Sequence, residues 1–186
     1  MILIGLFLLG AGCSQYNSMV SLDEDVANSW SKVESAYQRR ADLIPNLVET
    51  VKGVAEFEKG TFTAITEARS KVSSLNIDPS NLNAEQIQAF QEAQGGLSQS
   101  LGRLMLVAEN YPELKASQNF RELQAQLEGT ENRIKVERDR FNDQVTVFNK
   151  KIRRFPSSLF ANVFGFDRKM MFESEEGTQN APKVEF

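Results

Sequence analysis

Several charged and amide side chains fall on the apolar faces of helices that the sequence predicts. Glu131 lies seven residues before Arg138, and Asn142 lies seven residues before Asn149, so each pair shares one helix face. Grouped carboxylates of this kind can act as general acids and bases or hold a hard metal ion. The full set of candidate polar residues is Glu58, Arg69, Glu109, Glu131, Arg138, Asn142 and Asn149.

A structural role for these residues is favoured over a catalytic one. Arg69 and Arg138 are available to neutralise the acids, and paired charges on helix seams fix the register between helices. The chain has no histidine, which excludes Ser-His-Asp and Cys-His catalysis and the Glu-x-x-His metal pairs of ferritin-like bundles. Its single cysteine excludes intrachain disulfides, zinc ribbons and iron–sulfur clusters. We therefore expect no catalytic residue, metal ligand or cofactor, and no enzymatic activity.

The charge balance argues against nucleic acid as a partner. The 186 residues include 21 Lys and Arg against 25 Asp and Glu, a net charge of −4, without a basic stripe. Small basic groups occur at Arg39-Arg40, at Lys150-Lys151 and at Arg153-Arg154. Such groups can meet phosphate headgroups or a protein partner, but a solvated surface is the favoured interpretation.

The first thirteen residues, MILIGLFLLGAGC, are apolar and uncharged. As a helix they span only about 20 Å, which is short of the ~30 Å hydrocarbon core of a bilayer. Small residues precede Cys13 directly, as they do at the lipidated cysteine of bacterial lipoproteins. A signal segment with lipid attachment at Cys13 is therefore favoured over an uncleaved anchor, and a buried core helix is the weakest alternative.

Apolar residues recur at helical spacing between Leu22 and Val72, which predicts a long first helix ending at Ser73-Ser74. Pro45 interrupts this pattern, because it removes one N–H and crowds the carbonyl of Ala41. We expect the first helix to kink or break near Asp42–Pro45.

Two further long helices follow. Asn83 is expected to cap the second, which carries a heptad of apolar residues from Ile87 to Tyr111 before Pro112 stops it. Glycines in this heptad are expected to let a neighbouring helix approach closely; they are Gly95, Gly96 and Gly102.

The third helix is expected to start near Ser117–Asn119 and run to about Arg154, before a short helix over Ser158–Val163. No segment alternates with a period of two, so no strand is predicted. Long helices joined by short loops predict an all-α, antiparallel up-and-down bundle of three to four long helices.

Aromatic residues gather toward the C-terminus, where Phe155 and Phe160 are expected to cap the core of the bundle. From Asp167 the sequence turns acidic and loose, which predicts a flexible tail over 167–186. The last residues, Pro182–Phe186, again carry apolar side chains. They are interpreted as a short docking segment, with a frayed terminus as the alternative.

Four stretches of the chain form a distinctive set of motifs. The most specific is Arg39-Arg40-Ala41-Asp42-Leu43-Ile44-Pro45-Asn46-Leu47, which continues as VETVKG. The others are YNSMV at 16–20, ENYPELKA at 109–116 and TENRI at 130–134. Together they resemble the pattern of the LemA family of bacterial membrane-associated proteins, and the likeness runs from about Tyr16 to Phe186.

The resemblance implies a helical bundle outside the cytoplasmic membrane, tethered at its N-terminus, and it implies no activity. The expected organisation is a signal or anchor segment over 1–13, a bundle over 16–166 and the tail. The leading hypothesis is a non-enzymatic, membrane-tethered scaffold or adaptor that faces the periplasm or cell exterior and contacts envelope proteins. A self-associating structural lipoprotein is the alternative, and a carboxylate-dependent enzyme ranks third.

Overall fold

The computed structural model describes residues 2–52, 59–75, 77–79 and 82–173, and these form helices without a strand. The all-α prediction is confirmed. In this part of the chain the helices are α1 (Ile2–Lys52), α2 (Lys59–Ser73), α3 (Ala84–Ala108), α4 (Pro112–Ala116), α5 (Gln118–Arg153) and α6 (Ser157–Phe164).

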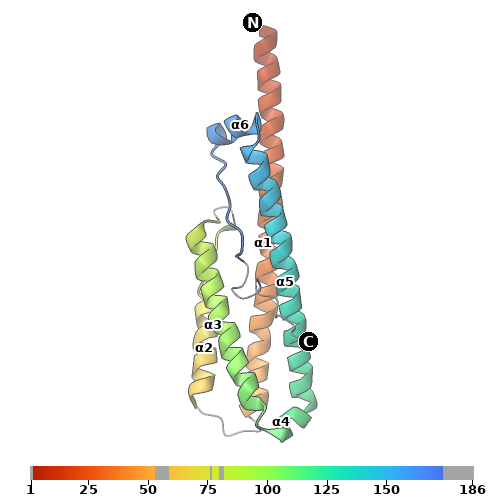
Figure 1. Cartoon of the computed structure of the whole chain (residues 1–186), viewed down its shortest axis with the longest axis vertical. Coiled ribbons are helices and arrows are strands. Elements are labelled where there is room, and N and C mark those ends of the chain that lie inside the picture. Colours follow the sequence, from red (N-terminus) through yellow and green to blue (C-terminus); the bar gives the residue numbers. More distant parts are fainter. Residues whose placement is uncertain (1, 53–58, 76, 80–81, 174–186) are drawn as a thin grey trace, which may run out of the picture.

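The helices form an elongated bundle in which α1 packs mainly against α5, and α2 packs against α3 (Figure 1). Two hydrogen bonds show how α1 and α5 pair. Gln15, in the first third of α1, is bonded to Lys151 near the end of α5. Arg40, further along α1, is bonded to Glu131 in the first half of α5. α4 lies at the opposite end of the bundle from the N-terminus and α6. The start of α1 extends beyond the other helices.

Local sequence signals set most helix ends. The Asn83 side chain accepts a hydrogen bond from the Gln86 N–H, so the predicted cap of α3 is confirmed. α3 ends at Ala108, and Pro112 takes the first turn of α4, where its missing N–H costs nothing. Gly165 ends α6 at φ 75°, a conformation that favours glycine.

Of the two alternatives expected near Pro45, the break is excluded, because Pro45 lies inside α1, which continues to Lys52. Of the helical region predicted to end at Ser73-Ser74, the structure describes α1 up to Lys52 and α2 from Lys59. The carbonyl of Ala41 loses its helical donor to Pro45, and Nε of Arg69 in α2 donates to it over 3.3 Å. A partner from another helix thus compensates for the proline.

Two hydrophobic cores fill the bundle. The upper core, toward α6, surrounds Trp30, whose ring contacts those of Phe90, Phe141 and Phe172. The lower core, toward α4, lies around Leu47, Leu97, Leu104 and Leu114 among other buried residues. The α5 residues on the predicted apolar face are buried from Phe120 to Ile152.

Two expectations about packing are wrong. A Cβ built on Gly95, Gly96 or Gly102 meets nothing within 4 Å, so these glycines do not admit a neighbouring helix of the same chain. Phe155 is 82% exposed and does not cap the core, because it follows the last turn of α5 and lies outside the α1–α5 seam. Phe160 does pack against the upper core.

The residues after α6 are packed rather than loose. The segment 166–173 descends along α5, and its Lys169 and Phe172 are buried at 8% and 4% exposure. The predicted flexible tail therefore does not begin at Asp167. The predicted docking segment Pro182–Phe186 lies outside the described residues.

Candidate functional site

A layer of polar side chains lies between the two hydrophobic cores. Arg40 of α1 is 2% exposed. Its guanidinium donates to Glu131 Oε2 of α5 over 2.8 Å, and to Ser98 Oγ and Gln94 Oε1 of α3 over 2.9 and 2.7 Å. We call Arg40, Gln94, Ser98 and Glu131 the polar layer. On α1, for example, the upper core ends at Tyr37 and the lower core begins at Ile44.

Protein groups hold both terminal nitrogens of the Arg40 guanidinium, whereas its buried Nε has no hydrogen-bond partner among the described residues. The planar fork of this group reaches two helices at once, which an ammonium group on a flexible stem would not match. The guanidinium also lies 5.1 Å from the centroid of the Tyr37 ring. These contacts tie the register of α1 to that of α3 and α5. The prediction of a solvated surface at Arg39-Arg40 is wrong for Arg40 and holds only for Arg39, which is exposed.

Tyr37 carries the clearest electrostatic signature near the polar layer. Burial raises the pKa of Tyr37 above its ordinary value of 10.0, because the phenolate would lose its hydration. The positive charges of Arg138 and Arg40 oppose this rise in the pKa, and a hydrogen bond from Arg138 acts in the same opposing direction. The neutral phenol is therefore the form that the folded chain stabilises.

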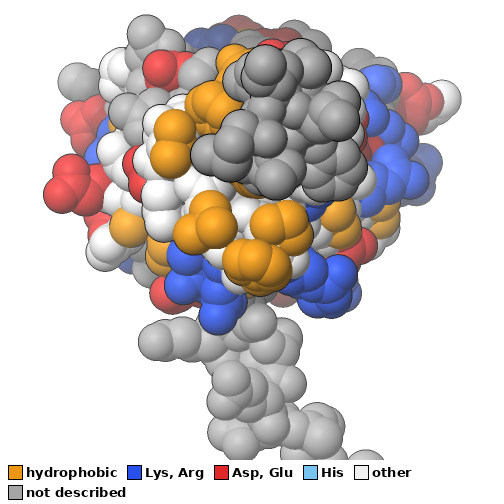
Figure 2. Space-filling view, turned by 90° about the horizontal axis from the view of Figure 1, so that it is seen from above, with side chains coloured by type: hydrophobic (Ala, Val, Ile, Leu, Met, Phe, Trp, Pro, Cys, Tyr) orange, Lys and Arg blue, Asp and Glu red, His pale blue; other side chains and the backbone are white. Residues whose placement is uncertain are grey.

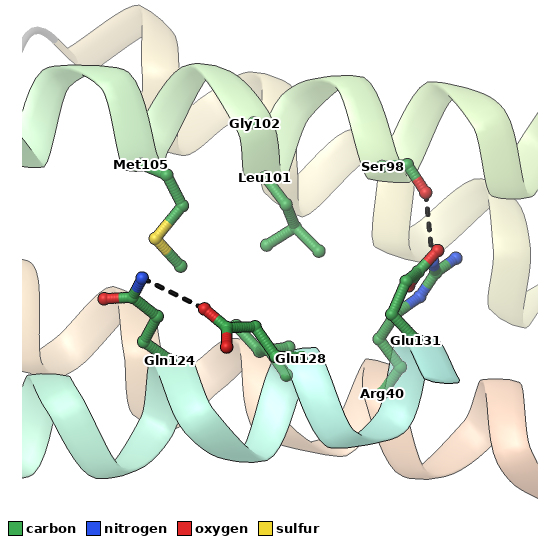
Figure 3. A pocket seen from close by; sticks show the side chains of 9 residues that line it. Arg40, Ser98, Leu101, Gly102, Met105, Gln124, Glu128 and Glu131 are labelled. Carbon is green, nitrogen blue, oxygen red and sulfur yellow. Dashed lines mark hydrogen bonds and ion pairs between the residues drawn. The ribbon is translucent and has the colours of Figure 1, made fainter. Parts of the chain in front are cut away.

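A pocket of about 240 Å3 opens between α3 and α5 beside the polar layer (Figure 3). Leu101 and Met105 reach into it from α3, facing Gln124 and Glu128 of α5, with Arg40 and Glu131 at one end. Gln124 Nε2 donates to Glu128 Oε1 over 3.2 Å. The pocket joins an apolar wall to a carboxylate rim, which suits a partner side chain with an apolar stem and a polar or cationic end.

Asn142 and Asn149 hold the segment 166–173 against α5. The amide of Asn149 donates to the carbonyl of Lys169 over 2.8 Å and accepts from its N–H over 3.0 Å. Asn142 makes the same two bonds with Phe172, over 3.1 and 2.8 Å. Each asparagine side chain thus makes the two hydrogen bonds that a neighbouring β-strand would make with one residue of the segment. The seven-residue spacing of Asn142 and Asn149 places both on one face of α5.

Charged contacts complete this attachment. Lys169 Nζ forms an ion pair with Asp23 Oδ1 of α1 over 2.6 Å and lies 5.5 Å from the centroid of the Phe148 ring. Arg138 donates to the carbonyl of Glu173 over 2.9 Å, and its guanidinium lies 4.9 Å from the centroid of the Phe172 ring. Because Arg138 also bonds Tyr37, it links α1, α5 and the segment 166–173.

The remaining predicted residues are more dispersed. Arg69 bonds the Ala41 carbonyl, as described above, and the Glu109 side chain is exposed at the end of α3. Glu58 lies outside the described residues. Within the signature, Ile44 and Leu47 are buried in the lower core, while the exposed members are Arg39, Asp42, Pro45 and Asn46, with Leu43 half-buried.

Sequence reasoning missed Glu137, which is 1% exposed. Its Oε1 pairs with Arg133 over 2.8 Å and with Arg140 over 3.0 Å on the same helix. Sequence reasoning also missed the polar layer as a unit, because Gln94 and Ser98 are uncharged residues within the heptad stretch from Ile87 to Tyr111. Lys169 gave no signal, since its burial depends on Asp23 of a distant helix.

Across the residues that the structure describes, no helix combines the length and the apolar character needed to cross a membrane. In the same part of the chain, no three Asp, Glu or Cys side chains gather as they would around a metal ion.

Fold and site define a helical-bundle protein in which a few buried polar residues join neighbouring helices. The chain belongs to the LemA family, whose model matches residues 29–186. It is similar to magnetosome protein MamQ 2 of Paramagnetospirillum magneticum, with 28% identity over 178 residues that cover 87% of this chain and 65% of the relative. The same values hold for magnetosome protein MamQ of Magnetospirillum gryphiswaldense. Protein LemA of Metamycoplasma hominis is 24% identical over 160 residues, covering 86% and 69%. The chain spans just under two thirds of the magnetosome relatives.

Proposed function

We propose that this chain is a non-enzymatic helical scaffold or adaptor, tethered to a membrane through its N-terminus and facing the periplasm or cell exterior. The observation that carries this proposal is the continuity of α1. One helix runs without interruption from Cys13, directly after the apolar stretch, through both hydrophobic cores. A tether and a bundle share one rigid element, which suits a protein that holds partners at a membrane.

The pairing of α1 with α5 supports the up-and-down topology that we propose for the scaffold. Residues that advance along α1 from Gln15 to Arg40 pair with residues that go back along α5 from Lys151 to Glu131. We infer from this order that the two helices are antiparallel, as the sequence predicts. The pocket beside the polar layer is the place we propose for a partner segment.

Lipid attachment at Cys13 is the proposed means of tethering. The Cys13 side chain is exposed, and it directly follows the apolar stretch and the small residues Gly10 to Gly12. Labelled fatty acid should enter the wild-type chain and be absent from Cys13→Ser. Equal labelling of both proteins would exclude Cys13 as the attachment point and leave the apolar segment itself as the anchor.

Fractionation tests the tether, and crosslinking in intact cells tests the scaffold role. The full chain should resist alkaline extraction from membranes and should be cleaved by protease added to cells with a permeabilised outer layer. A photo-reactive residue at Met105, in the pocket, should capture other envelope proteins, while one at the exposed Val147 should not. Protection from protease would place the bundle in the cytoplasm and contradict the proposal.

Self-association is the second candidate, and the exposed glycines favour it. Open space above Gly95, Gly96 and Gly102 leaves room for a helix of another chain to approach α3 closely. Crosslinks from this face to a second copy of the chain, without other proteins, would support a purely structural role. Substituting Gly96 by Leu should then abolish the crosslink without lowering the stability of the monomer, because Leu favours a helix more than Gly does.

A further inference from the structure

We propose that α6 is a membrane-surface helix, which lies on an anionic lipid surface as a second contact beside the N-terminal segment. This inference rests on the proposed tether, because it gives the same end of the bundle a specific way of meeting the lipid. It gives a role to α6, which contributes no residue to the polar layer or to the pocket beside it.

Exposed apolar side chains concentrate on α6 and the residue pair before it. Phe155 and Val163 are 82% and 78% exposed, and Leu159, four residues from each, is exposed as well. Phe164 and Tyr16 add two half-exposed aromatic rings, which contact each other at a centroid distance of 4.9 Å. Exposed aliphatic and aromatic groups that gather in this way mark an interaction surface rather than ordinary exposed residues.

The inner face of α6 is fixed to the bundle, so the outer face is held in place. Ala161 is buried in the upper core, and Ser157 Oγ donates to Gln15 Oε1 of α1 over 2.8 Å. Phe160 lies against Gly12, with its ring 3.2 Å from where a Cβ would stand. α6 therefore presents one apolar face outward from the end of the bundle where α1 begins (Figure 1).

Basic side chains border the apolar face. Between Lys150 and Lys169 the chain carries six basic residues and one acidic residue, although its overall charge is −4. Lys150, Arg153, Arg154 and Arg168 are exposed, whereas Lys169 is buried in its ion pair with Asp23. Seen from this end, Lys and Arg side chains flank a patch of apolar side chains on both sides (Figure 2).

An apolar face with a basic border matches the surface of an anionic bilayer. The apolar side chains enter the boundary between headgroups and acyl chains, and the guanidinium groups meet lipid phosphates. A soluble protein partner would cover the apolar face but would not explain why the basic residues gather at the end where the apolar start of α1 emerges. The positive charge of the border and its position beside the start of α1 together favour a lipid surface over a protein partner.

Fluorescence at single positions tests this in the full chain. An unnatural amino acid with a clickable handle replaces Val163 or Val136 and takes one environment-sensitive dye, so that Cys13, the proposed lipid attachment point, is kept. Val136 is the matched control, because it is an exposed valine (43%) in the middle of α5. The proteins are reconstituted in vesicles of phosphatidylcholine alone, or of equimolar phosphatidylcholine and phosphatidylglycerol, with brominated lipid as quencher.

In the anionic vesicles, the dye at residue 163 should shift to the blue and be quenched, and the dye at residue 136 should do neither. Chain that floats with the vesicles without quenching at 163 would overturn the docking of α6 and leave the tether standing. Equal quenching at both sites would also overturn it, because the whole bundle would then adsorb. Chain that fails to float would overturn both proposals.

Charge removal provides the second test. Arg153→Gln with Arg154→Gln should lower the docking equilibrium constant on anionic vesicles roughly 30-fold, at about 1 kcal/mol for each basic residue. Arg103→Gln with Arg121→Gln removes the same charge from the other end of the bundle and should leave docking unchanged. Equal effects from the two pairs, or equal docking on neutral vesicles, would contradict recognition by the basic border.

Discussion

At the scale of single residues, Glu131 is the exposed end of an ion pair whose other end, Arg40, is buried. The Glu131 side chain is 56% exposed, whereas that of Arg40 is 3% exposed. We expect Glu131→Ala to lower the free energy of unfolding by about 2–3 kcal/mol. Its removal leaves a buried charge without its counter-ion, and the exposure of Glu131 reduces the usual ~3–5 kcal/mol.

Urea denaturation followed by circular dichroism measures this loss. Glu128→Ala is the matched control, because Glu128 lies one turn earlier on α5 and accepts a hydrogen bond from its neighbour Gln124 on the same helix (Figure 3). The double variant Arg40→Met, Glu131→Ala should recover part of the loss, since no buried charge remains. A double variant less stable than Glu131→Ala would contradict the argument.

Pro45 and Arg69 should be energetically coupled. Arg69→Met leaves the Ala41 carbonyl without its donor and should lower the free energy of unfolding by about 1 kcal/mol. In a Pro45→Ala background the helix supplies its own N–H to that carbonyl, so Arg69→Met should then cost much less. A double-mutant cycle measures this coupling, and additive effects would exclude it.

The buried Tyr37 gives the stability a dependence on alkaline pH. Its pKa is raised in the folded chain, so its contribution is fully present below the unfolded value of 10.0 and lost as the pH rises through the folded value. Above pH 10, the free energy of unfolding should therefore fall more steeply in the wild type than in Tyr37→Phe. Urea denaturation at a series of alkaline pH values gives both slopes, and parallel slopes would contradict the burial argument.

Sequence reasoning could expect polar residues in the seams but could not choose between adjacent positions. Between Ile134 and Phe141, steps of three and four reach Glu137, and steps of four and three reach Arg138. Both orders fit a helical period, and Glu137 is the residue that is buried deepest. Arg40 and Ala41 pose the same choice between Tyr37 and Ile44, and there both residues are buried.

At the scale of elements, two asparagines attach the segment 166–173 to α5 independently. Asn149→Ala should speed hydrogen exchange at the Lys169 amide and leave the Phe172 amide protected, and Asn142→Ala should do the reverse. Each loss should lower the free energy of unfolding by about 1–2 kcal/mol, because buried backbone groups lose their partner. Exchange measured by NMR reports both amides, and Asp143→Ala, an exposed neighbour, is the control.

Helices were predictable where the apolar period and the caps act locally. α5, α6 and the Asn83 cap lie within a residue or two of the predicted positions. The fate of Pro45 and of residues 167–173 was not predictable from local pattern. Both depend on distant donors, namely Arg69 for the Ala41 carbonyl and Asn142 and Asn149 for the extended segment.

At the scale of the whole molecule, α1 sets how far the bundle reaches. At ~1.5 Å per residue, the helix from Cys13 to Lys52 spans about 58 Å. A donor dye at the exposed Lys115 of α4 should therefore transfer little energy to acceptors on the vesicle surface, and a donor at residue 163 should transfer strongly. Equal transfer from the two positions would indicate that the bundle lies flat on the membrane.

The uninterrupted course of α1 also has a mechanical consequence. A force applied at its N-terminal end meets no loop that could extend before the folded core is loaded. The pull acts along the helix axis and strains the α1–α5 interface in shear, so many side chains share the load from Met19 to Arg40. Detaching α1 by such a pull therefore requires many contacts along the α1–α5 interface to break together.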